Sequence, residues 1–226
     1  MAYYIELHFH TAQSSHCGKV SAEEGVKQYR ENGYSGIVVT DHLSKKERGG
    51  PEGQEWNQVC DRFLEGYYAA KRAVEGMDFR VFLGMEIRFP HDENDFLAYG
   101  FTEEFLRGHP WIYMEELSDL MEYAKKEQLY IAQAHPFRSK CSLAAPDYLH
   151  GIEVYNGNPR HQSHNDLAFQ AAKEHQLGMI AGSDFHQPED LSDRRTLFAE
   201  MPHTEQELAE MLRKGAFTII NPRGVL

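Results

Sequence analysis

The chain has 226 residues, 41% of them hydrophobic, which suits one domain built on a single buried core. Its net charge of −12 argues against long nucleic acid as a partner, because lysine and arginine contacts to phosphate supply most of that affinity. No apolar run is long enough to cross a membrane and no signal peptide is recognisable, so we expect a cytoplasmic protein that does not bind membranes.

Strands and helices are predicted to alternate along the whole chain. The helix at residues 21–32 begins with a capping box, Ser21 with Glu24, and ends at Gly33. The charged, glycine-rich segment 44–54 is predicted to be a mobile loop. Strands are predicted at residues 3–9, 34–40, 79–89, 95–101, 129–134, 151–155, 178–182 and 216–220, and helices at 21–32, 55–75, 114–128, 165–176 and 204–214.

This alternation predicts an α/β fold with βαβ units and a mostly parallel sheet. About seven units in a chain of this length favour a closed or nearly closed barrel, with an open doubly wound sheet as the alternative. The sequence contains no internal repeat and no long linker, so residues 1–226 are predicted to form a single domain.

The sequence contains 13 histidines, and many of them follow predicted strands. Active sites of α/β folds form at the carboxyl ends of the strands, where these side chains would meet. His8 and His10 are two residues apart and would point to the same face of a strand. A mixture of imidazoles and carboxylates suits zinc, manganese or iron rather than calcium. The candidate ligands at strand ends are His8, His10, His16, His42, Glu86, His135, Asp184 and His186.

Short motifs around these residues, taken in order, resemble the PHP (polymerase and histidinol phosphatase) family of metal-dependent phosphoesterases. The resemblance covers nearly the whole chain and implies a distorted (β/α)7 TIM-like barrel with two to three divalent metal ions. The motifs are HFH at 8–10, His16, TDH at 40–42, GME at 84–86, AHP at 134–136 and GSDFH at 182–186.

The resemblance also implies how the ligands are shared among three ions. One ion would be held by His8, His10, Glu86 and Asp184. Glu86 would bridge to a second ion, which His135 also binds, and a third would be held by His16, His42 and His186. The family often has one more histidine on the strand after the glutamate, but the segment NDFLAYGF has none. Asp95 occupies the equivalent place as an oxygen ligand, with a turn carboxylate as the alternative.

The function implied by this resemblance is hydrolysis of a small phosphorylated substrate, a phosphate monoester or a small nucleotide. The nucleophile would be a metal-bridging hydroxide held by Glu86, His135 and Asp184. Arginine binds phosphate oxygens in a bidentate manner, and the candidates are Arg138, Arg160 and Arg194. The alternatives are an exonuclease on short oligonucleotides, a histidinol-phosphate phosphatase, or a non-catalytic metal-binding domain. A serine hydrolase is not expected, because a GxSxG motif is absent.

Three residues beside these motifs have two interpretations each. Cys17 is predicted to be a small buried side chain, with binding or tuning a metal as the alternative. Asp41 would either orient a ligand histidine or cap the end of a strand. Asn156 would contact substrate or a ligand, or form a turn. The three cysteines, Cys17, Cys60 and Cys141, are widely spaced and odd in number, which argues against a disulfide framework.

Overall fold

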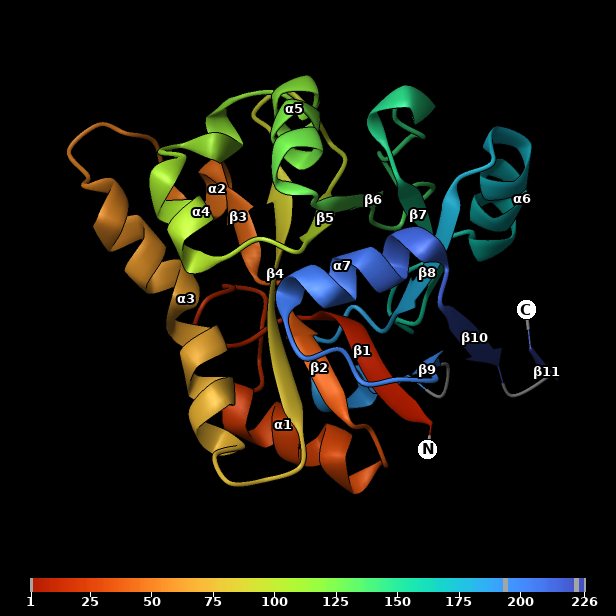
Figure 1. The fold of residues 1–226 in the computed structure, drawn as a ribbon. Coiled ribbons are helices and arrows are strands. Elements are labelled where there is room, and N and C mark those ends of the chain that lie inside the picture. The colour runs from red at the N-terminus through yellow and green to blue at the C-terminus, as the bar shows by residue number, and fades with distance from the viewer. Residues whose placement is uncertain (1, 193–194, 222–223, 226) are drawn as a thin grey trace.

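A curved sheet of eleven strands forms the centre of the computed structural model, which describes residues 2–192, 195–221 and 224–225 (Figure 1). The strand order is β11-β10-β9-β1-β2-β4-β5-β6-β7-β8, and β3 pairs with β4. The strands are β1 (Tyr3–Phe9), β2 (Gly36–Val39), β3 (His42–Ser44), β4 (Arg80–Arg88), β5 (Phe96–Tyr99), β6 (Tyr130–Gln133), β7 (Gly151–Asn156), β8 (Gly178–Gly182), β9 (Arg195–Phe198), β10 (Phe217–Asn221) and β11 (Gly224–Val225).

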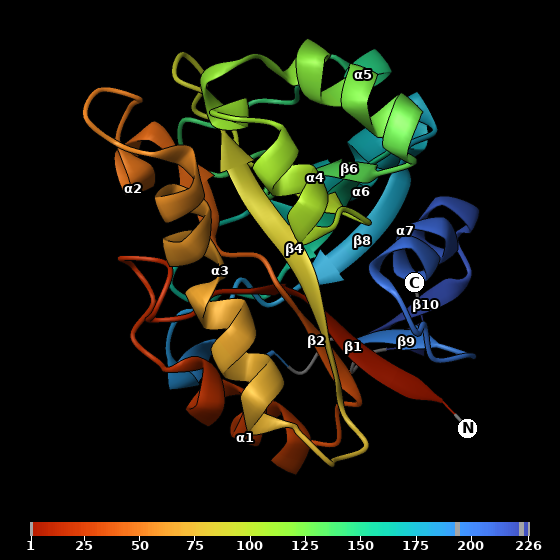
Figure 2. The same ribbon diagram turned by 60° about the vertical axis from the view of Figure 1, so that its left-hand side comes forward.

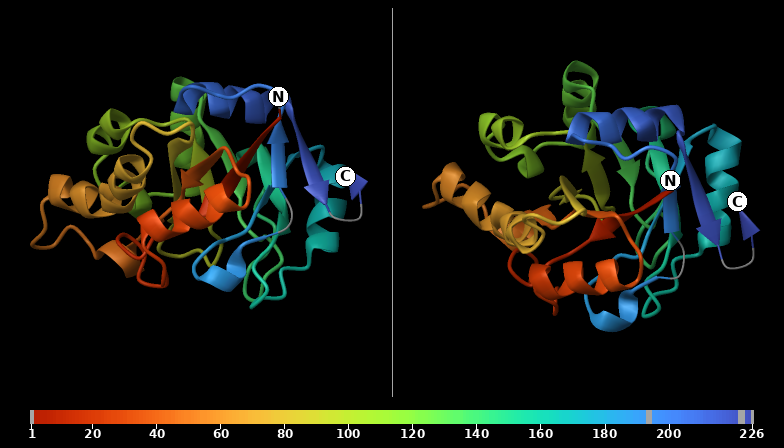
Figure 3. Two further views of the ribbon diagram at one scale, coloured as in Figure 1. Left: turned by 90° about the horizontal axis from the view of Figure 1, so that it is seen from below. Right: turned by 60° about the horizontal axis from the view of Figure 1, so that its bottom comes forward.

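Helices cover the outside of this sheet, with α1 and α3 on one side and α6 on the opposite side (Figure 3). In Figure 2 the long strand β4 runs beside β2 and β1, and α3 and α1 lie to the left of these strands. The helices are α1 (Ala22–Glu31), α2 (Lys45–Arg48), α3 (Trp56–Ala73), α4 (Glu103–Gly108), α5 (Leu117–Glu127), α6 (Asn165–His175) and α7 (Glu205–Lys214).

The sheet curves back on itself, so that the segment after β8 meets the end of β1. The backbone N–H of His10 donates to the carbonyl of Phe185 (3.0 Å), and the N–H of Phe185 donates to the carbonyl of His8 (3.1 Å). These hydrogen bonds bring the segment after β8, at one end of the strand order, back beside β1. The predicted nearly closed, distorted α/β barrel is therefore confirmed.

The prediction of a mostly parallel sheet is wrong, because parallel and antiparallel pairs are mixed. Strand β5 is antiparallel to both β4 and β6, and β9 is antiparallel to both β1 and β10. The link between β4 and β5 is too short for the helical crossover that a parallel pair requires. The regular βα repeat is broken at that point.

Two apolar cores hold the fold together. The larger lies between the sheet and its outer helices, and the smaller lies inside the curved sheet, where Leu7 and Tyr99 meet Leu208 and Leu212 of α7. Helix α7 also contacts β5, β6 and β8, so it closes one end of the barrel. It begins at the N-cap Thr204, whose side chain accepts from the N–H of Glu207, and it ends at Gly215 in a left-handed conformation.

The segment predicted to be a mobile loop is ordered in its first part. Ser44 ends β3 and caps α2 by accepting from the N–H of Glu47 (3.3 Å). Arg48 is buried and its Nε and Nη2 donate to the carbonyl of His42 at 3.1 and 2.9 Å. These contacts fix the start of the segment beside the TDH motif. No helix among the described residues is long and apolar enough to cross a membrane.

Candidate metal centre

All of the predicted metal ligands except His16 meet at one end of the barrel. His8 and His10 come from the end of β1, His42 begins β3, and Glu86 lies on β4. The other members of the cluster are Asp95, just before β5, His135, just after β6, and Asp184 and His186, just after β8. Side chains far apart in the sequence are therefore brought together by the ends of neighbouring strands.

Glu86 lies at the centre of this cluster. Its carboxylate oxygens are 3.3 Å from Nε2 of His8, 3.3 Å from Nε2 of His10 and 2.8 Å from Nδ1 of His42. It is also 3.1 Å from Nε2 of His135. A carboxylate shared by four imidazoles is suited to bridging neighbouring metal ions.

Asp184 and Asp95 flank this centre on either side. Oδ1 of Asp184 is 3.5 Å from Nε2 of both His8 and His10, and Oδ2 of Asp95 is 3.8 Å from Nε2 of His135. Three groups have ligand atoms within 4.8 Å of one another: His8, His10 and Asp184; His10, His42 and His186; and His42, Glu86 and Asp95.

In three of the histidines Nδ1 forms the hydrogen bond to the protein, and Nε2 is therefore free to bind metal. Nδ1 of His8 lies 2.9 Å from the Glu153 carboxylate, and Nδ1 of His186 lies 2.8 Å from the carbonyl oxygen of Asp184. Both partners only accept, so in each neutral ring Nδ1 carries the proton and Nε2 carries the lone pair.

The same argument applies to His10 through Ser15. Oγ of Ser15 gives its proton to Asp41 (2.7 Å) and lies 3.5 Å from Nδ1 of His10. Because the hydroxyl has one proton, it can only accept from His10. Nε2 of His10 is therefore the ligand atom.

Several buried polar atoms of the cluster lack a hydrogen-bond partner among the described residues. They are Nε2 of His8, Nε2 of His10, Oε2 of Glu86 and Nδ1 of His135. Buried polar groups are nearly always paired, so each unpaired atom needs an explanation. A set of imidazole nitrogens and carboxylate oxygens in this state fits divalent metal ions.

The charged side chains of the cluster shift one another's pKa values. Burial by itself lowers the pKa of His8, but the charges of Glu153 and Asp184 outweigh it and raise that pKa well above its usual value. The pKa of His42 is raised in the same way, chiefly by Glu86, and that of His135 is raised to about 10. Burial raises the pKa of Glu86, but the neighbouring imidazoles outweigh it and hold that pKa well below its usual value. Without metal, the imidazoles of His8, His42 and His135 therefore hold a proton more tightly than ordinary histidines do.

Glu153 is a site residue that the sequence analysis missed. It is fully buried on β7 and accepts hydrogen bonds from Nδ1 of His8 (2.9 Å), the N–H of His135 (3.0 Å) and Nδ2 of Asn156 (2.9 Å). The only clue in the sequence was a carboxylate inside the apolar strand GIEVY. Glu153 orients ligands from two different strands.

Asp41 and Asn156 both belong to this hydrogen-bond network. Asp41 accepts from the N–H of Thr11 (2.8 Å) and from Oγ of Ser15 (2.7 Å), so it acts on His10 through Ser15. Among the described residues, the hydrogen bonds of its carboxylate go to Thr11 and Ser15 rather than to the imidazole of His42 beside it. Asn156 accepts from Arg138 (2.9 Å) and its Nδ2 lies 3.3 Å from Asp184.

His16 and Cys17 are placed differently from what the sequence suggested. The His16 side chain is 79% exposed and its Nδ1 contacts Glu47, outside the three groups of ligand atoms. Cys17 is exposed, so its prediction as a buried side chain is wrong. Partial burial raises the pKa of its thiol, but the nearby imidazoles of His186 and His42 outweigh it and lower that pKa to about 7.

The arginines near the cluster are held by carboxylates. Arg138 donates through Nη2 to Asp184 (2.7 Å), and its buried Nε has no partner among the described residues. Arg160 forms a bidentate pair with Asp190 (3.0 and 2.6 Å). Arg194 lies outside the described residues. Arg88, which the sequence analysis did not single out, pairs with Asp95 through Nε (2.7 Å).

Two ligand candidates have strained backbones. His135 and Asp184 have φ angles of 27° and 55°, a left-handed region that non-glycine residues rarely occupy. Such strain often accompanies functional sites, where the surrounding structure enforces it. It turns these side chains toward the cluster at the ends of β6 and β8.

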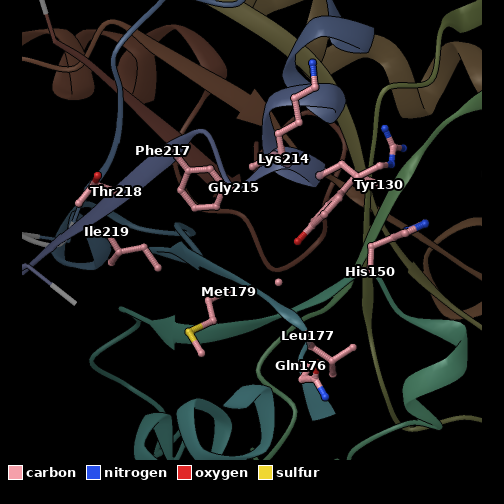
Figure 4. Close-up of a pocket in the computed structure, with 13 residues that line it drawn as sticks. Tyr130, His150, Gln176, Leu177, Met179, Lys214, Gly215, Phe217, Thr218 and Ile219 are labelled. Atoms are coloured by element: carbon pink, nitrogen blue, oxygen red, sulfur yellow. The ribbon is translucent and has the colours of Figure 1, made fainter. Parts of the chain in front are cut away.

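The cluster opens into a cavity of about 360 Å³, which Arg88, Arg138 and Arg160 also line. That volume falls in the range of small-molecule sites. A second cavity, of about 640 Å³, lies elsewhere, between β8, β10 and the end of α7 (Figure 4). It is lined by Tyr130 and Met179 among others, and by none of the predicted site residues.

Comparison with known proteins agrees with this geometry. The model of the PHP domain matches residues 6–220. No curated protein matches the sequence. Solved structures share the fold at low sequence identity. One is a two-domain protein from Bacteroides vulgatus that contains a predicted PHP-like metal-dependent phosphoesterase, with 20% identity over 97% of this chain and 65% of that one (TM-score 0.68).

Two further structures are similar. PsfC from Pseudomonas syringae is 16% identical over 92% of this chain and 88% of that one (TM-score 0.66). Endonuclease Q, solved with a 27-mer duplex that contains an abasic lesion, is 16% identical over 95% of this chain (TM-score 0.63). The present chain spans only 57% of Endonuclease Q and 65% of the Bacteroides protein.

Proposed function

Because the chain belongs to the PHP family, we propose that it is a metal-dependent phosphoesterase that hydrolyses a phosphate monoester or a small nucleotide. The observation that carries this proposal is the set of buried imidazole and carboxylate atoms without hydrogen-bond partners at the floor of a cavity lined by arginines.

Each of the three ions would be held by a different set of side chains. His8, His10 and Asp184 would hold one ion, with Glu86 bridging to a second ion near His135 and Asp95. His42 and His186 would hold a third. Divalent ions at these positions would polarise phosphate oxygens and lower the pKa of water toward neutrality. Glu86, His135 and Asp184 would hold the attacking water through the ions that they bind.

The arginines would recognise the phosphate. Nε of Arg138 is buried and has no partner among the described residues, so it is a donor available to a phosphate oxygen. The pair with Asp190 uses two of the five N–H donors of Arg160, and the guanidinium lines the cavity. The cavity of about 360 Å³ suits a small substrate better than a duplex.

The test is metal analysis combined with a substrate panel. Protein purified without chelator should contain divalent metal and release phosphate from one class among nucleotides, sugar phosphates, histidinol phosphate and short oligonucleotides, with manganese or zinc added. His10→Ala and Asp184→Ala should abolish turnover. His175→Ala, an exposed change on α6, should leave it intact.

The panel also addresses a nuclease function, because the fold resembles that of Endonuclease Q. Cleavage of an oligonucleotide without phosphate release from any monoester would replace the present proposal with that one. Bound metal with no turnover on the whole panel would leave a binding role instead.

A further inference from the structure

We propose that the cavity of about 640 Å³ between β8, β10 and the end of α7 is a binding site for a small organic anion with an apolar body, such as a medium-chain carboxylate. The proposal does not rest on the metal centre or on the proposed function. It concerns the other end of the barrel strands, away from the candidate metal ligands.

This cavity lies at the amino ends of three neighbouring parallel strands. Tyr130 begins β6, His150 precedes β7, and Gly178 begins β8. The last turn of α7 and part of β10 form the remaining walls. The volume falls in the range of small-molecule sites. The cavity and the metal centre are therefore at opposite ends of the same strands.

Apolar side chains form much of the wall. They are Leu177, Met179, Leu212, Phe217 and Ile219. The apolar surface of a ligand that packs against them is removed from water, which favours binding. This part of the cavity therefore suits a hydrocarbon chain or a ring.

The charged side chains at the cavity are basic. In a protein of net charge −12, none of the described residues that line it is an aspartate or a glutamate, whereas Arg213 and Lys214 are cationic. Lys214 is paired with Glu210 (2.5 Å). Arg213 donates through Nη2 alone to the carbonyls of Gln128 (2.6 Å) and Leu129 (2.9 Å), and a guanidinium has further donors on Nε and Nη1. Arg213 is therefore the cation best suited to pair with an anionic ligand.

A hydroxyl without a partner is the second observation that points to a ligand. Tyr130 is 1% exposed, and its hydroxyl has no hydrogen bond among the described residues. Figure 4 shows this hydroxyl directed toward the space between Phe217 and Met179. A buried unpaired hydroxyl costs free energy that a phenylalanine at the same position would avoid. An oxygen atom of a ligand would supply the missing partner.

Two glycines make room for the hydroxyl. A Cβ on Gly151 would lie 2.2 Å from the Tyr130 oxygen, and a Cβ on Gly178 would lie 2.4 Å from it. The two glycines are paired with each other in β7 and β8. The backbone of these strands therefore accommodates the hydroxyl itself and not only the ring of Tyr130.

His150 supplies a further donor beside Tyr130. Its Nδ1 accepts from the N–H of Ile131 (3.0 Å), and its ring stacks on that of Tyr130 with 5.6 Å between the ring centroids. Burial and the charge of Arg213 lower the pKa of His150, so its imidazole is neutral at pH 7 and carries its proton on Nε2. Donors from Tyr130, His150 and Arg213 suit a carboxylate, which only accepts.

Octanoate binding to the chelated protein tests the site without involving the metal centre. Isothermal titration calorimetry should show one saturable site for octanoate. Octylamine should bind much more weakly, because its ammonium group would be repelled by Arg213. The fluorescent anion anilinonaphthalene sulfonate should bind the folded protein and be displaced by octanoate.

Two variants should weaken octanoate binding. Tyr130→Phe removes the hydroxyl and Arg213→Gln removes the charge, and each should lower the affinity by about tenfold, because hydrogen bonds to an ionised group are stronger than neutral ones. The matched controls are Tyr148→Phe, an exposed tyrosine, and Lys27→Gln, an exposed lysine of α1. Both controls should bind octanoate as the unaltered protein does.

Thermal unfolding separates a ligand-binding hydroxyl from a structural one. Without octanoate, Tyr130→Phe should be at least as stable as the unaltered protein, because it removes an unpaired buried group. With octanoate, the variant should gain less stability than the unaltered protein. A lower stability of the variant without octanoate would mean that the hydroxyl has a structural partner, and it would overturn the inference.

The binding data offer two further ways to contradict the proposal. Equal affinities for octanoate and octylamine would overturn the choice of an anion. Absence of saturable binding, or octanoate binding that is unchanged in both Tyr130→Phe and Arg213→Gln, would overturn the site. None of these results would affect the proposed phosphoesterase, which is tested by metal content and phosphate release.

Discussion

At the residue scale, the ligand histidines depend on carboxylates that do not touch the metal. Glu153 holds the proton of His8 on Nδ1 and also accepts from the backbone of His135. Asp41 does the same for His10 through Ser15. These contacts select the tautomer that presents Nε2 to the cavity. The negative charges of the buried carboxylates Glu153 and Asp41 therefore contribute to metal binding although neither residue is a proposed ligand.

Glu153→Gln tests this dependence. The amide oxygen can still accept from His8, but the amide carries no charge, and its NH2 group would replace the oxygen that accepts from the N–H of His135 and from Nδ2 of Asn156. Zinc affinity should fall by about 10- to 100-fold, measured by competition with a chromophoric chelator. Glu174→Gln, on the exposed face of α6, is the control. An unchanged affinity in Glu153→Gln would show that the hydrogen bond alone orients His8.

The raised pKa values of His8, His42 and His135 predict a pH dependence of metal binding. A raised pKa means that the imidazole keeps its proton at neutral pH in the metal-free protein, and the metal must displace it. Affinity should therefore rise with pH above 6.5, the ordinary histidine pKa, toward the value of about 10 for His135. The rise should be roughly tenfold per pH unit for each proton released.

Calorimetry in buffers of different ionisation enthalpy measures these protons directly. Release at pH 7.5 is expected for the unaltered protein. Affinity that levels off near pH 6.5 would mean that the imidazoles titrate as exposed histidines do.

The ligands themselves could be predicted from the sequence, but the residues that orient them could not. Imidazoles and carboxylates at strand ends stand out because the chemistry needs those residue types at those places. Glu153 lies within a strand, and its partners His8 and His135 come from distant parts of the chain. His16 was predicted as a ligand from its place in the sequence, but its side chain turns outward, because the loop conformation cannot be inferred from spacing alone.

At the element scale, helix α3 packs on the loop that supports the site. A Cβ on Gly66 would lie 2.0 Å from Oγ1 of Thr11 and 2.7 Å from Oδ2 of Asp41. The N–H of Gly66 also donates a hydrogen bond to Oγ of Ser14 (2.9 Å). The helix can approach the loop this closely only because Gly66 has no side chain.

Gly66→Ala should therefore destabilise the protein although alanine is the better helix former. The gain in helix propensity is about 1 kcal/mol at most. Forcing a methyl group against Thr11 and Asp41 should cost about 1–3 kcal/mol and outweigh it. Denaturant unfolding of the chelated protein measures the difference.

Gly108 provides the matched control for this change. It ends α4, and a Cβ there would have no atom within 4 Å. Gly108→Ala should be neutral or stabilising. Equal changes in the free energy of unfolding of the two variants would show that the close approach of α3 to the loop is not the reason for a glycine at position 66.

Most long elements were predictable because each combines a clear periodicity with recognisable ends. Strand β1 and helix α1 match closely, and α1 has the predicted Ser21 cap. Elements of only a few residues, such as β3 and β9, are fixed by pairing with distant strands rather than by their own pattern. The direction of β5 was also missed, since it follows from loop length and not from its apolar sequence.

At the scale of the whole molecule, the site depends on closure of the barrel. The cluster joins residues from His8 to His186, contributed by strands around the curved sheet. Helix α7 carries no candidate ligand, but it fills the inside of the sheet at one end with Leu208 and Leu212. An unfolded chain could not hold these ligands together, so metal binding and global folding should be coupled.

Metal should accordingly stabilise the fold. Zinc at about 100 times its dissociation constant should add about 2.7 kcal/mol to the free energy of unfolding. For a domain of this size that corresponds to a rise of roughly 5–10 °C in the unfolding temperature. The measurement is thermal unfolding with chelator and with zinc. The gain should fall in His10→Ala, which lacks a ligand of the ion that His8 and Asp184 also hold, and persist in His175→Ala. Equal gains in both variants would place the stabilising ion somewhere other than this cluster.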